Sequence, residues 1–201
     1  MKRNLQLLAS VLRFIAIGIL FSSALCLAVE FSADFVDTKA GRTNSGKVYL
    51  KGDKVRREVT EGPRKGTITI YRLDKEVVWV LNPAQKTYTE MPGMGKQIGE
   101  LSLNDPRVQD MLKKLGELKP AGTETVNGYV CDKYALVYHE KAMGTQYQWI
   151  AQKLNVPIKI EHQGSRFSML IEYKNINEGQ IPDSLFELPP GYRKMAIPGF
   201  N

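Results

Sequence analysis

The sequence predicts a mainly β protein built on one large, curved antiparallel sheet with one clear helix. Between Gly46 and Met91 the apolar positions lie two residues apart, which is the period of a half-buried strand. Turns of about two to five residues separate the runs, and such short turns join only antiparallel neighbours. The same pattern returns after Gly116, so that about ten or eleven strands are expected in all.

The first half of the chain contains the clearest strands. They are expected at Phe31–Val36, Lys47–Lys51, Val55–Val59, Thr67–Tyr71, Val77–Leu81 and Lys86–Glu90. The polar stretch Gly41–Gly46, followed by Lys47, resembles a phosphate-binding loop. However, Val48 follows where that motif needs Ser or Thr, and the stretch leads into a strand rather than a helix. A hairpin is therefore the favoured interpretation.

One amphipathic helix is expected after a glycine-rich loop at Met91–Asn104. Asp105 is a suitable N-cap, Pro106 suits the first helical position, and Gly116 is expected to end the helix. Its apolar stripe consists of Val108, Met111, Leu112 and Leu115. A helix of about three turns is not stable alone in water, so it must lie on the sheet.

A second set of strands follows the helix. They are expected at Thr123–Val126, Tyr129–Tyr138, Thr145–Ala151, Pro157–His162 and Arg166–Lys174. Asn127-Gly128 is a strong signal for a two-residue hairpin turn. The segment Pro182–Met195 is expected to be irregular, because Pro189, Pro190 and Gly191 exclude a helix.

The first 28 residues have the order of a secretory signal peptide. A basic head precedes the uninterrupted apolar stretch Phe14–Phe21, and small residues follow it. Cys26-Leu27-Ala28 offers a cleavage site, so that residues 29–201 would form a single periplasmic or otherwise exported domain. An uncleaved membrane anchor, or a lipoprotein acylated at Cys26, are the alternatives.

Charge and cysteine content narrow the class of function. The chain carries a net charge of +7, and the leader contains three cations and no acid, which leaves about +4 on the rest. Acids and bases are interspersed along the strands, so we expect no nucleic-acid binding and at most a weak attraction to membrane surfaces. Cys131 is the only cysteine after the leader; it is either buried, which is favoured, or pairs between chains.

No catalytic or metal-binding pattern is present. His139 and His162 are the only histidines, and neither has a partner at metal-ligand spacing. The sequence has no nucleophile elbow of the form G-x-S-x-G. We therefore expect no metal, no cofactor and no enzymatic activity.

The concave face of the expected sheet has more apolar surface than one short helix covers, and it forms either a solid core or a cavity. Methionines near the glycine-rich loop suit a lid over a cavity. The residues expected to line the cavity are apolar and come from strands, loop and helix. They are Val48, Leu50, Ile68, Ile70, Trp79, Leu81, Met94, Val108, Met111, Leu112, Leu115, Trp149, Phe167 and Met169.

Three segments resemble a family of exported bacterial proteins of uncharacterised function. They are Gly46–Glu58, Tyr71–Pro83 and Asp183–Tyr192, and Asn127–Tyr134 and Gln148–Ile150 fit the same family. That family is similar to the LolA and LolB lipoprotein carriers, and more distantly to envelope-stress sensors of the same fold. The resemblance implies an unclosed antiparallel β-barrel with a helical lid over an apolar concave face.

Two classes of function follow from the resemblance. In the first, the protein binds a lipid, the acyl chains of a lipoprotein or another apolar ligand in the half-barrel cavity. In the second, the same fold serves as a non-enzymatic protein-interaction or envelope-stress sensor module, with an envelope protein as partner. An exposed apolar mouth would serve either class.

Overall fold

A computed structural model describes residues 29–92, 113–165 and 168–196. The leader, the glycine-rich loop after Pro92 and residues 105–112 of the expected helix lie outside these ranges. Within the described ranges, twelve strands form one sheet in the order β12-β6-β5-β4-β3-β2-β1-β11-β10-β9-β8-β7. The strands are β1 (Glu30–Lys39), β2 (Arg42–Lys51), β3 (Lys54–Glu61), β4 (Ile68–Arg72), β5 (Val77–Asn82), β6 (Thr87–Pro92), β7 (Gly116–Val126), β8 (Tyr129–Tyr138), β9 (Thr145–Ala151), β10 (Val156–Gln163), β11 (Ser168–Glu178) and β12 (Arg193–Lys194).

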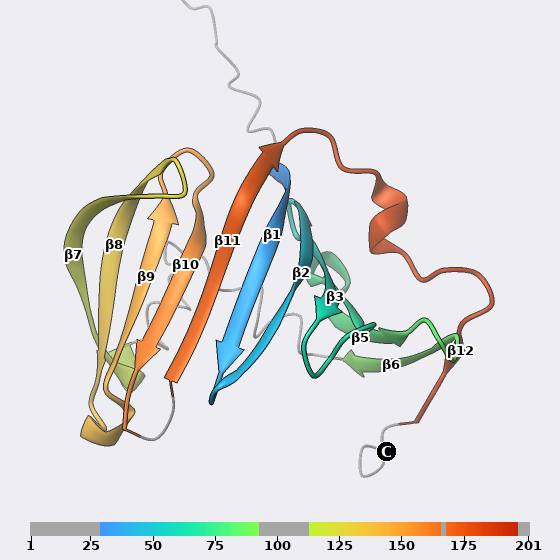
Figure 1. The fold of residues 1–201 in the computed structure, drawn as a ribbon, viewed down its shortest axis with the longest axis horizontal. Coiled ribbons are helices and arrows are strands. Elements are labelled where there is room, and N and C mark those ends of the chain that lie inside the picture. The colour runs from blue at the N-terminus through green and yellow to red at the C-terminus, as the bar shows by residue number, and fades with distance from the viewer. Residues whose placement is uncertain (1–28, 93–112, 166–167, 197–201) are drawn as a thin grey trace, which may run out of the picture.

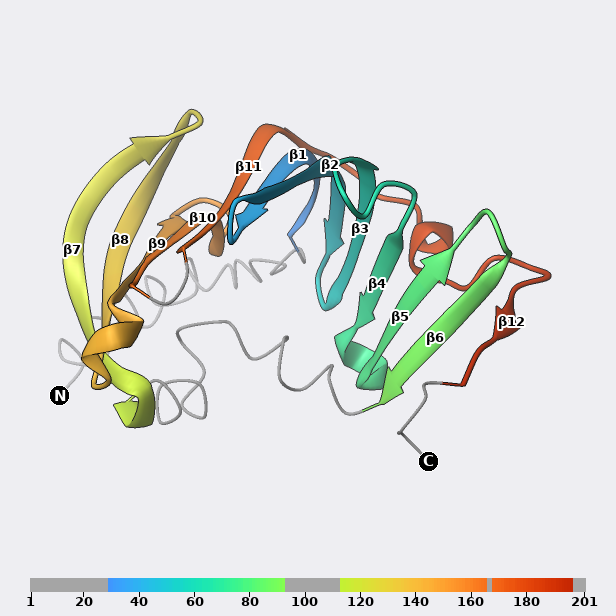
Figure 2. The ribbon, with the colours of Figure 1, turned by 60° about the horizontal axis from the view of Figure 1, so that its bottom comes forward.

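The sheet curves into a half-barrel that does not close (Figures 1 and 2). β7 forms one edge, and β6 with the short β12 forms the other. All neighbours pair antiparallel except β12, which runs parallel to β6. The expected open, antiparallel, mainly β fold is thus confirmed, with one strand more than the upper expectation.

β1 is the central strand and joins two meanders. On one side it pairs with β2, from which β3 to β6 follow in order. On its other side it pairs with β11, from which β10 to β7 follow in reverse order. The C-terminal segment after β11 runs along the outer side of β3 to β6 (Figure 2).

Side chains alternate between the two faces of the sheet. On the concave face, Ala33 lies opposite Val48, and Val48 opposite Arg57. The adjacent residues point outward, where Tyr49 lies opposite Arg56. Each face therefore has its own set of core residues.

Two hydrophobic clusters form most of the core. The first joins the concave side of β1 to β3 with residues of β8 to β10 and consists of Phe31, Ala33, Phe35, Val48, Val59, Cys131, Trp149, Ala151, Leu154 and Ile158. The second lies on the outer side of β4 and β5 beneath the C-terminal segment and consists of Ile70, Val77, Trp79, Leu81, Ile181 and Phe186. The burial of Cys131, expected from its strand context, is confirmed.

Two element boundaries differ from expectation. Residues 113–115 are helical, but Gly116 begins β7 rather than ending a helix in a loop. A side chain at Gly116 would lie 2.3 Å from the carbonyl oxygen of Val137 in the neighbouring strand, so only glycine fits there. β2 begins at Arg42, and the polar stretch before Lys47 pairs with β1 as a hairpin. Within the described ranges, no helix has the length and hydrophobicity needed to cross a bilayer.

Candidate functional site

The concave face carries a continuous row of apolar side chains across six strands. Successive cross-strand partners along this row, which we call the apolar row, are Phe31, Leu50, Val55, Tyr71, Val78 and Met91. Phe31 and Val78 are buried, whereas the other four are half-buried. At a strand spacing of about 4.8 Å, six strands make the row about 24 Å long.

Arg57 lies on the same face, between the apolar row and Phe35. Its guanidinium stacks over the Phe35 ring at 4.2 Å, and its Nη2 donates to Asp37 Oδ2 at 3.2 Å. Arg64 donates to the same carboxylate oxygen at 3.4 Å. The Nε of Arg57 is buried and has no hydrogen-bond partner among the described residues. The concave face therefore combines apolar side chains with one cation that has an unused donor.

Gly46 makes this arrangement possible. It lies opposite Phe35 in β1 and Val59 in β3. A Cβ at Gly46 would lie 1.8 Å from the carbonyl oxygen of Glu58 and 3.0 Å from the edge of the Phe35 ring. The missing side chain leaves the space that the ring occupies.

The outer face of β3 to β6 is covered by residues Ile181–Tyr192, which we call the strap. Phe186 of the strap is fully buried against the second cluster. Arg56 donates to the carbonyl oxygen of Leu185 at 2.9 Å, and Arg72 donates to that of Phe186 at 3.1 Å. An irregular segment needs such donors, because its buried carbonyl groups have no sheet partner.

Charge pairs fix the strap at its middle. Arg72 forms two hydrogen bonds to Asp74, at 2.8 and 2.7 Å, and an ion pair with Glu187. The hydrogen bonds from Arg72 lower the pKa of Asp74. Burial alone would raise the pKa of Glu187, but Arg72 and Lys75 lower it overall. Both carboxylates therefore stay ionised and hold the strap to β4.

Trp149 of β9 belongs to the first hydrophobic cluster. Its ring is placed between the ammonium groups of Lys133, at 4.7 Å, and Lys159, at 4.4 Å. Its Nε1 donates to Glu124 Oε2 at 2.7 Å. Hydrogen bonds from Lys133 and then Trp149 lower the pKa of Glu124. This indole is 4% exposed and is sealed by its charged neighbours.

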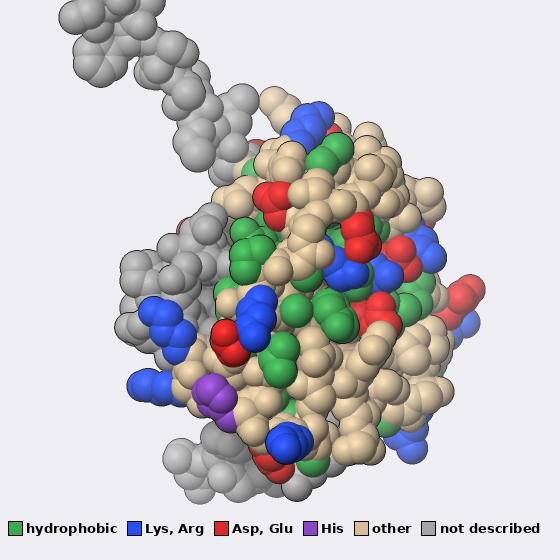
Figure 3. All heavy atoms as spheres, turned by 90° about the vertical axis from the view of Figure 1, so that its left-hand side faces the viewer, with side chains coloured by type: hydrophobic (Ala, Val, Ile, Leu, Met, Phe, Trp, Pro, Cys, Tyr) green, Lys and Arg blue, Asp and Glu red, His purple; other side chains and the backbone are tan. Residues whose placement is uncertain are grey.

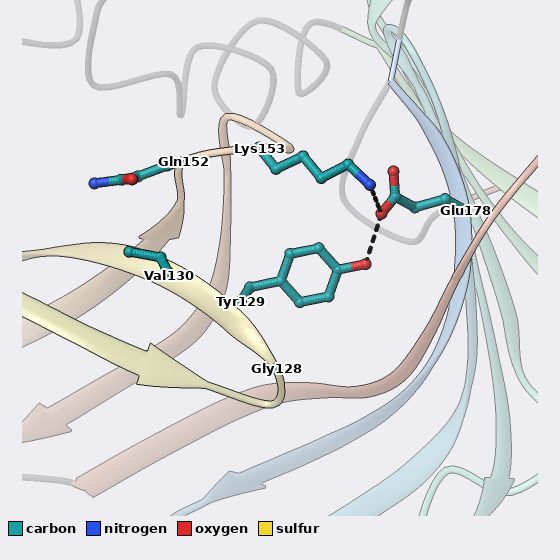
Figure 4. Close-up of a pocket in the computed structure, with 6 residues that line it drawn as sticks. All are labelled: Gly128, Tyr129, Val130, Gln152, Lys153 and Glu178. Atoms are coloured by element: carbon teal, nitrogen blue, oxygen red, sulfur yellow. Dashed lines mark hydrogen bonds and ion pairs between the residues drawn. The ribbon is translucent and has the colours of Figure 1, made fainter.

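A polar hollow of about 480 Å³ lies where the tip of the β7–β8 hairpin meets β11, with Gly128 and Val130 in its lining. Tyr129 and Lys153 both point at Glu178 (Figure 4) and donate to its Oε1 at 2.9 and 2.7 Å. Lys153 and then Tyr129 lower the pKa of Glu178. Asn127 ties the tip to the backbone oxygen of Tyr173 at 2.8 Å. The ion pair between Lys153 and Glu178 therefore already spans the hollow.

The residues predicted to line one cavity are divided between the two faces. Val48, Leu50 and Met169 lie on the concave face. Ile68, Ile70, Trp79 and Leu81 lie together on the outer face beneath the strap, and Trp149 lies between its two lysines. Leu115 is 46% exposed beside the start of β7. Met94, Val108, Met111, Leu112 and Phe167 lie outside the described residues.

Two features of the site were missed by the sequence reasoning. Arg57 lies two residues from both Val55 and Val59. This spacing is the signal that could have placed a cation on the apolar face. The strap has apolar residues without a period, so nothing in its pattern showed which face it covers.

The histidines do not form a site. His162 is 1% exposed and packs against the Tyr138 ring at 5.5 Å, whereas His139 is exposed. Over the described parts of the chain, no group of three or more His, Cys, Asp or Glu side chains is arranged to hold a metal ion.

Residues 35–155 match the family described as "Domain of unknown function (DUF4412)". The chain belongs to the DUF4412 family. This confirms the expected membership of an uncharacterised family. No curated protein matches the DUF4412 chain.

Several solved structures share the fold of this DUF4412 protein. An uncharacterized conserved protein from Thermus thermophilus has 10% identity and a TM-score of 0.60, with 84% of this chain and 91% of that chain covered. MucB has 15% identity and a TM-score of 0.53, with 78% and 56% covered, so this chain spans about half of MucB. The LolA superfamily protein NE2245 from Nitrosomonas europaea has 12% identity and a TM-score of 0.38, with 80% and 90% covered.

Proposed function

We propose that this DUF4412 protein is an exported, non-enzymatic binding protein of the cell envelope. Its ligand is an apolar chain, such as that of a lipid or a lipidated protein, which lies on the concave face. The observation that carries the proposal is the apolar row, in which Leu50, Val55, Tyr71 and Met91 keep part of their surface open. These side chains give a ligand continuous apolar contact across the sheet.

The expected affinity follows from the surface that such a ligand buries. Each methylene removed from water contributes about 0.8 kcal/mol. The ordering of a flexible chain opposes this gain, which leaves an affinity in the micromolar range, or about −8 kcal/mol. The affinity should rise with chain length until the row is filled and then stay constant.

Arg57 gives the ligand a preferred polar end. It lies beside the row, and its Nε has no partner within the described residues. A guanidinium with a free donor in apolar surroundings favours a carboxylate or phosphate oxygen. The proposed ligand is therefore an anionic amphiphile rather than a neutral hydrocarbon.

Displacement of a fluorescent fatty acid by fatty acids of increasing length tests the proposal. An added probe is needed because Trp79 lies on the outer face beneath the strap and Trp149 is enclosed by Lys133 and Lys159, so neither indole lies in the apolar row. Leu50→Gln should weaken binding about ten-fold by placing an amide in the row. Val137→Gln is the matched control, since Val137 is 41% exposed on the outer face of β8. Equal affinity at all chain lengths, or equal loss in both variants, would contradict the proposal.

A protein-interaction module is the second candidate. Val130, which is 50% exposed at the hollow beside Glu178, favours a partner surface there. MucB, which shares the fold, has been crystallised in complex with MucA(peri). A stable complex with an envelope protein, combined with no fatty-acid binding, would support this second function instead.

A further inference from the structure

Hairpin turns from distant parts of the sequence meet at one end of the half-barrel. Because neighbouring strands are antiparallel, the turns after β1, β3, β8 and β10 lie at the same end. Arg64 N donates to Asn44 Oδ1 at 3.0 Å, which joins the β3–β4 turn to β2. Ala40 N donates to the Ser168 oxygen, and Ser165 Oγ to the Ala142 oxygen, both at 3.1 Å. These contacts make the turns one continuous rim.

This rim is strongly basic. We call residues 39–42, 61–66 and 140–144 together the basic end. It contains Lys39, Arg42, Arg64, Lys65 and Lys141, all exposed, but only two acids, Glu61 and Glu140. Within the described residues, Arg64 alone among these five cations has an ion pair, with Asp37 at 3.4 Å. The other four cations are exposed and have no ion pair with a described residue.

The opposite end of the half-barrel differs in its charge. Its lysines are neutralised by ion pairs: Lys51 and Lys54 with Asp183 at 3.1 and 2.7 Å, Lys75 with Glu187 at 3.3 Å, and Lys153 with Glu178 at 2.7 Å. Figure 3 shows the β7 side of the molecule, where several acidic side chains lie next to a cationic one. The unpaired positive charge is therefore a property of one end.

An exposed leucine extends the basic end. The backbone N–H of His139 donates to the oxygen of Leu115 at 3.0 Å, so Leu115 lies beside the β8–β9 turn. Its side chain is 46% exposed and follows Lys113 and Lys114. A hollow of about 560 Å³ lies here, lined by Lys113, Gly116, Glu117, Leu118 and His139. Lysines next to an exposed apolar side chain are typical of surfaces that contact the head-group region of a membrane.

We propose that the basic end is a docking surface for a membrane that contains anionic phospholipids. The cations meet the head-group phosphates, Leu115 reaches the interface, and the strands stand end-on to the membrane. The ion-paired end then faces away from it. This inference does not depend on whether the concave face binds an apolar chain.

Vesicle binding by the full-length chain tests the proposal. Partitioning is measured into two kinds of vesicle, phosphatidylcholine with phosphatidylglycerol and phosphatidylcholine alone. The readout is the ratio of the first partition coefficient to the second, because contributions to binding that do not depend on lipid charge cancel in this ratio. Each cation near an anionic surface contributes about five-fold. The triple variant Lys39→Gln, Arg42→Gln and Lys65→Gln should therefore lower the ratio about 100-fold. Added salt should lower the wild-type ratio as well.

The matched control removes three other exposed lysines, in Lys47→Gln, Lys153→Gln and Lys174→Gln. It has the same net charge as the test variant, so it should change the ratio by only about two-fold. Both variants are compared by thermal unfolding to confirm that they fold. An equal loss in both variants would show an effect of net charge alone, and it would overturn the proposal. So would equal partitioning of the wild type into the two kinds of vesicle.

Lysine acylation read by mass spectrometry tests the orientation. Anionic vesicles should protect Lys65 and Lys141 and leave Lys153, whose side chain is 70% exposed, reactive. Protection of Lys153 instead would overturn the proposal. If an acidic polypeptide protects Lys65 but vesicles do not, the basic end is a protein-binding surface and the membrane proposal is wrong.

Discussion

At the scale of single residues, Gly46 decides how closely three strands approach one another around Phe35. The ring of Phe35 fills the space above Gly46, and Arg57 stacks on that ring at 4.2 Å. The position of Arg57 on the concave face therefore depends on the lack of a side chain at Gly46. A small change at Gly46 should disturb both the sheet and the Arg57 contact.

Gly46→Ala should destabilise the protein by about 1–3 kcal/mol. The new Cβ would lie 1.8 Å from the backbone oxygen of Glu58, and a strand paired on both sides has little freedom to move. Gly179→Ala is the control, because a Cβ at Gly179 meets nothing within 4 Å. Urea unfolding measures both variants, and equal midpoints would contradict the role given to Gly46.

At the scale of elements, the strap turns the outer face of β3 to β6 into a second core. Its anchor Phe186 is apolar, whereas its backbone is held by the side chains of Arg56 and Arg72. Its carboxylates Asp183 and Glu187 meet lysines and an arginine from the sheet. The attachment of the strap therefore depends on the ionisation of acids.

Acid should weaken the attachment of the strap. Asp74 and Glu187 have pKa values below their ordinary values of 3.8 and 4.5. A carboxyl whose pKa is lower in the folded state stabilises the fold above its ordinary pKa, and this contribution is lost as the pH falls through the folded value. The urea midpoint should therefore fall as the pH decreases below about 4.5.

The double variant Asp74→Asn and Glu187→Gln provides the comparison. It is expected to be less stable at neutral pH, because Arg72 loses its charged partners. Its midpoint should fall less steeply below pH 4.5 than that of the wild type. Identical pH slopes for the two proteins would show that other acids cause the loss of stability.

Most strands could be predicted from the sequence because a period of two is visible in short windows. β7 was expected to begin at Thr123, since Pro120 and Gly122 interrupt its pattern. The structure keeps both residues in an edge strand, where the register shifts between Pro120 and Thr123. An edge strand tolerates such residues because one side has no neighbour.

The candidate site was harder to predict than the strands. The period shows that Ile70, Trp79 and Leu81 belong to buried faces, but it does not show whether a face is concave or convex. That choice depends on the direction in which the whole sheet curves and on where the strap lies. The concave placement of Val48 and the outer placement of Trp79 follow from this curvature.

At the scale of the whole molecule, the topology gathers charges that look dispersed in the sequence. Lys39 and Arg42 flank one turn, but β2 and β3 separate them from Lys65 in the sequence, and β4 to β8 separate Lys65 from Lys141. Each of them lies in or next to a turn at the same end of the sheet. An estimate of surface charge from the linear sequence averages them with the acids of the strands and misses the basic end.

The proposed export of the protein predicts a processed N-terminus. The basic head, apolar stretch and small residues before Val29 should direct cleavage after Ala28. N-terminal sequencing of protein recovered from the cell envelope should find Val29 or Glu30 as the first residue. An intact leader, or a lipid-modified Cys26, would show that the chain is held at a membrane by its N-terminus instead.

The central place of β1 has a consequence for the order of folding. Phe31 and Phe35 need Leu50 and Gly46 on one side, but Glu178 and Tyr173 on the other. The first partners follow almost at once during synthesis, whereas β11 is the last long strand to be made. Such distant pairings form slowly, and an unpaired strand edge promotes aggregation. Until β11 is synthesised, one edge of β1 in the middle of the sheet has no partner strand. A chain truncated before Ser168 would keep this edge of β1 unpaired permanently.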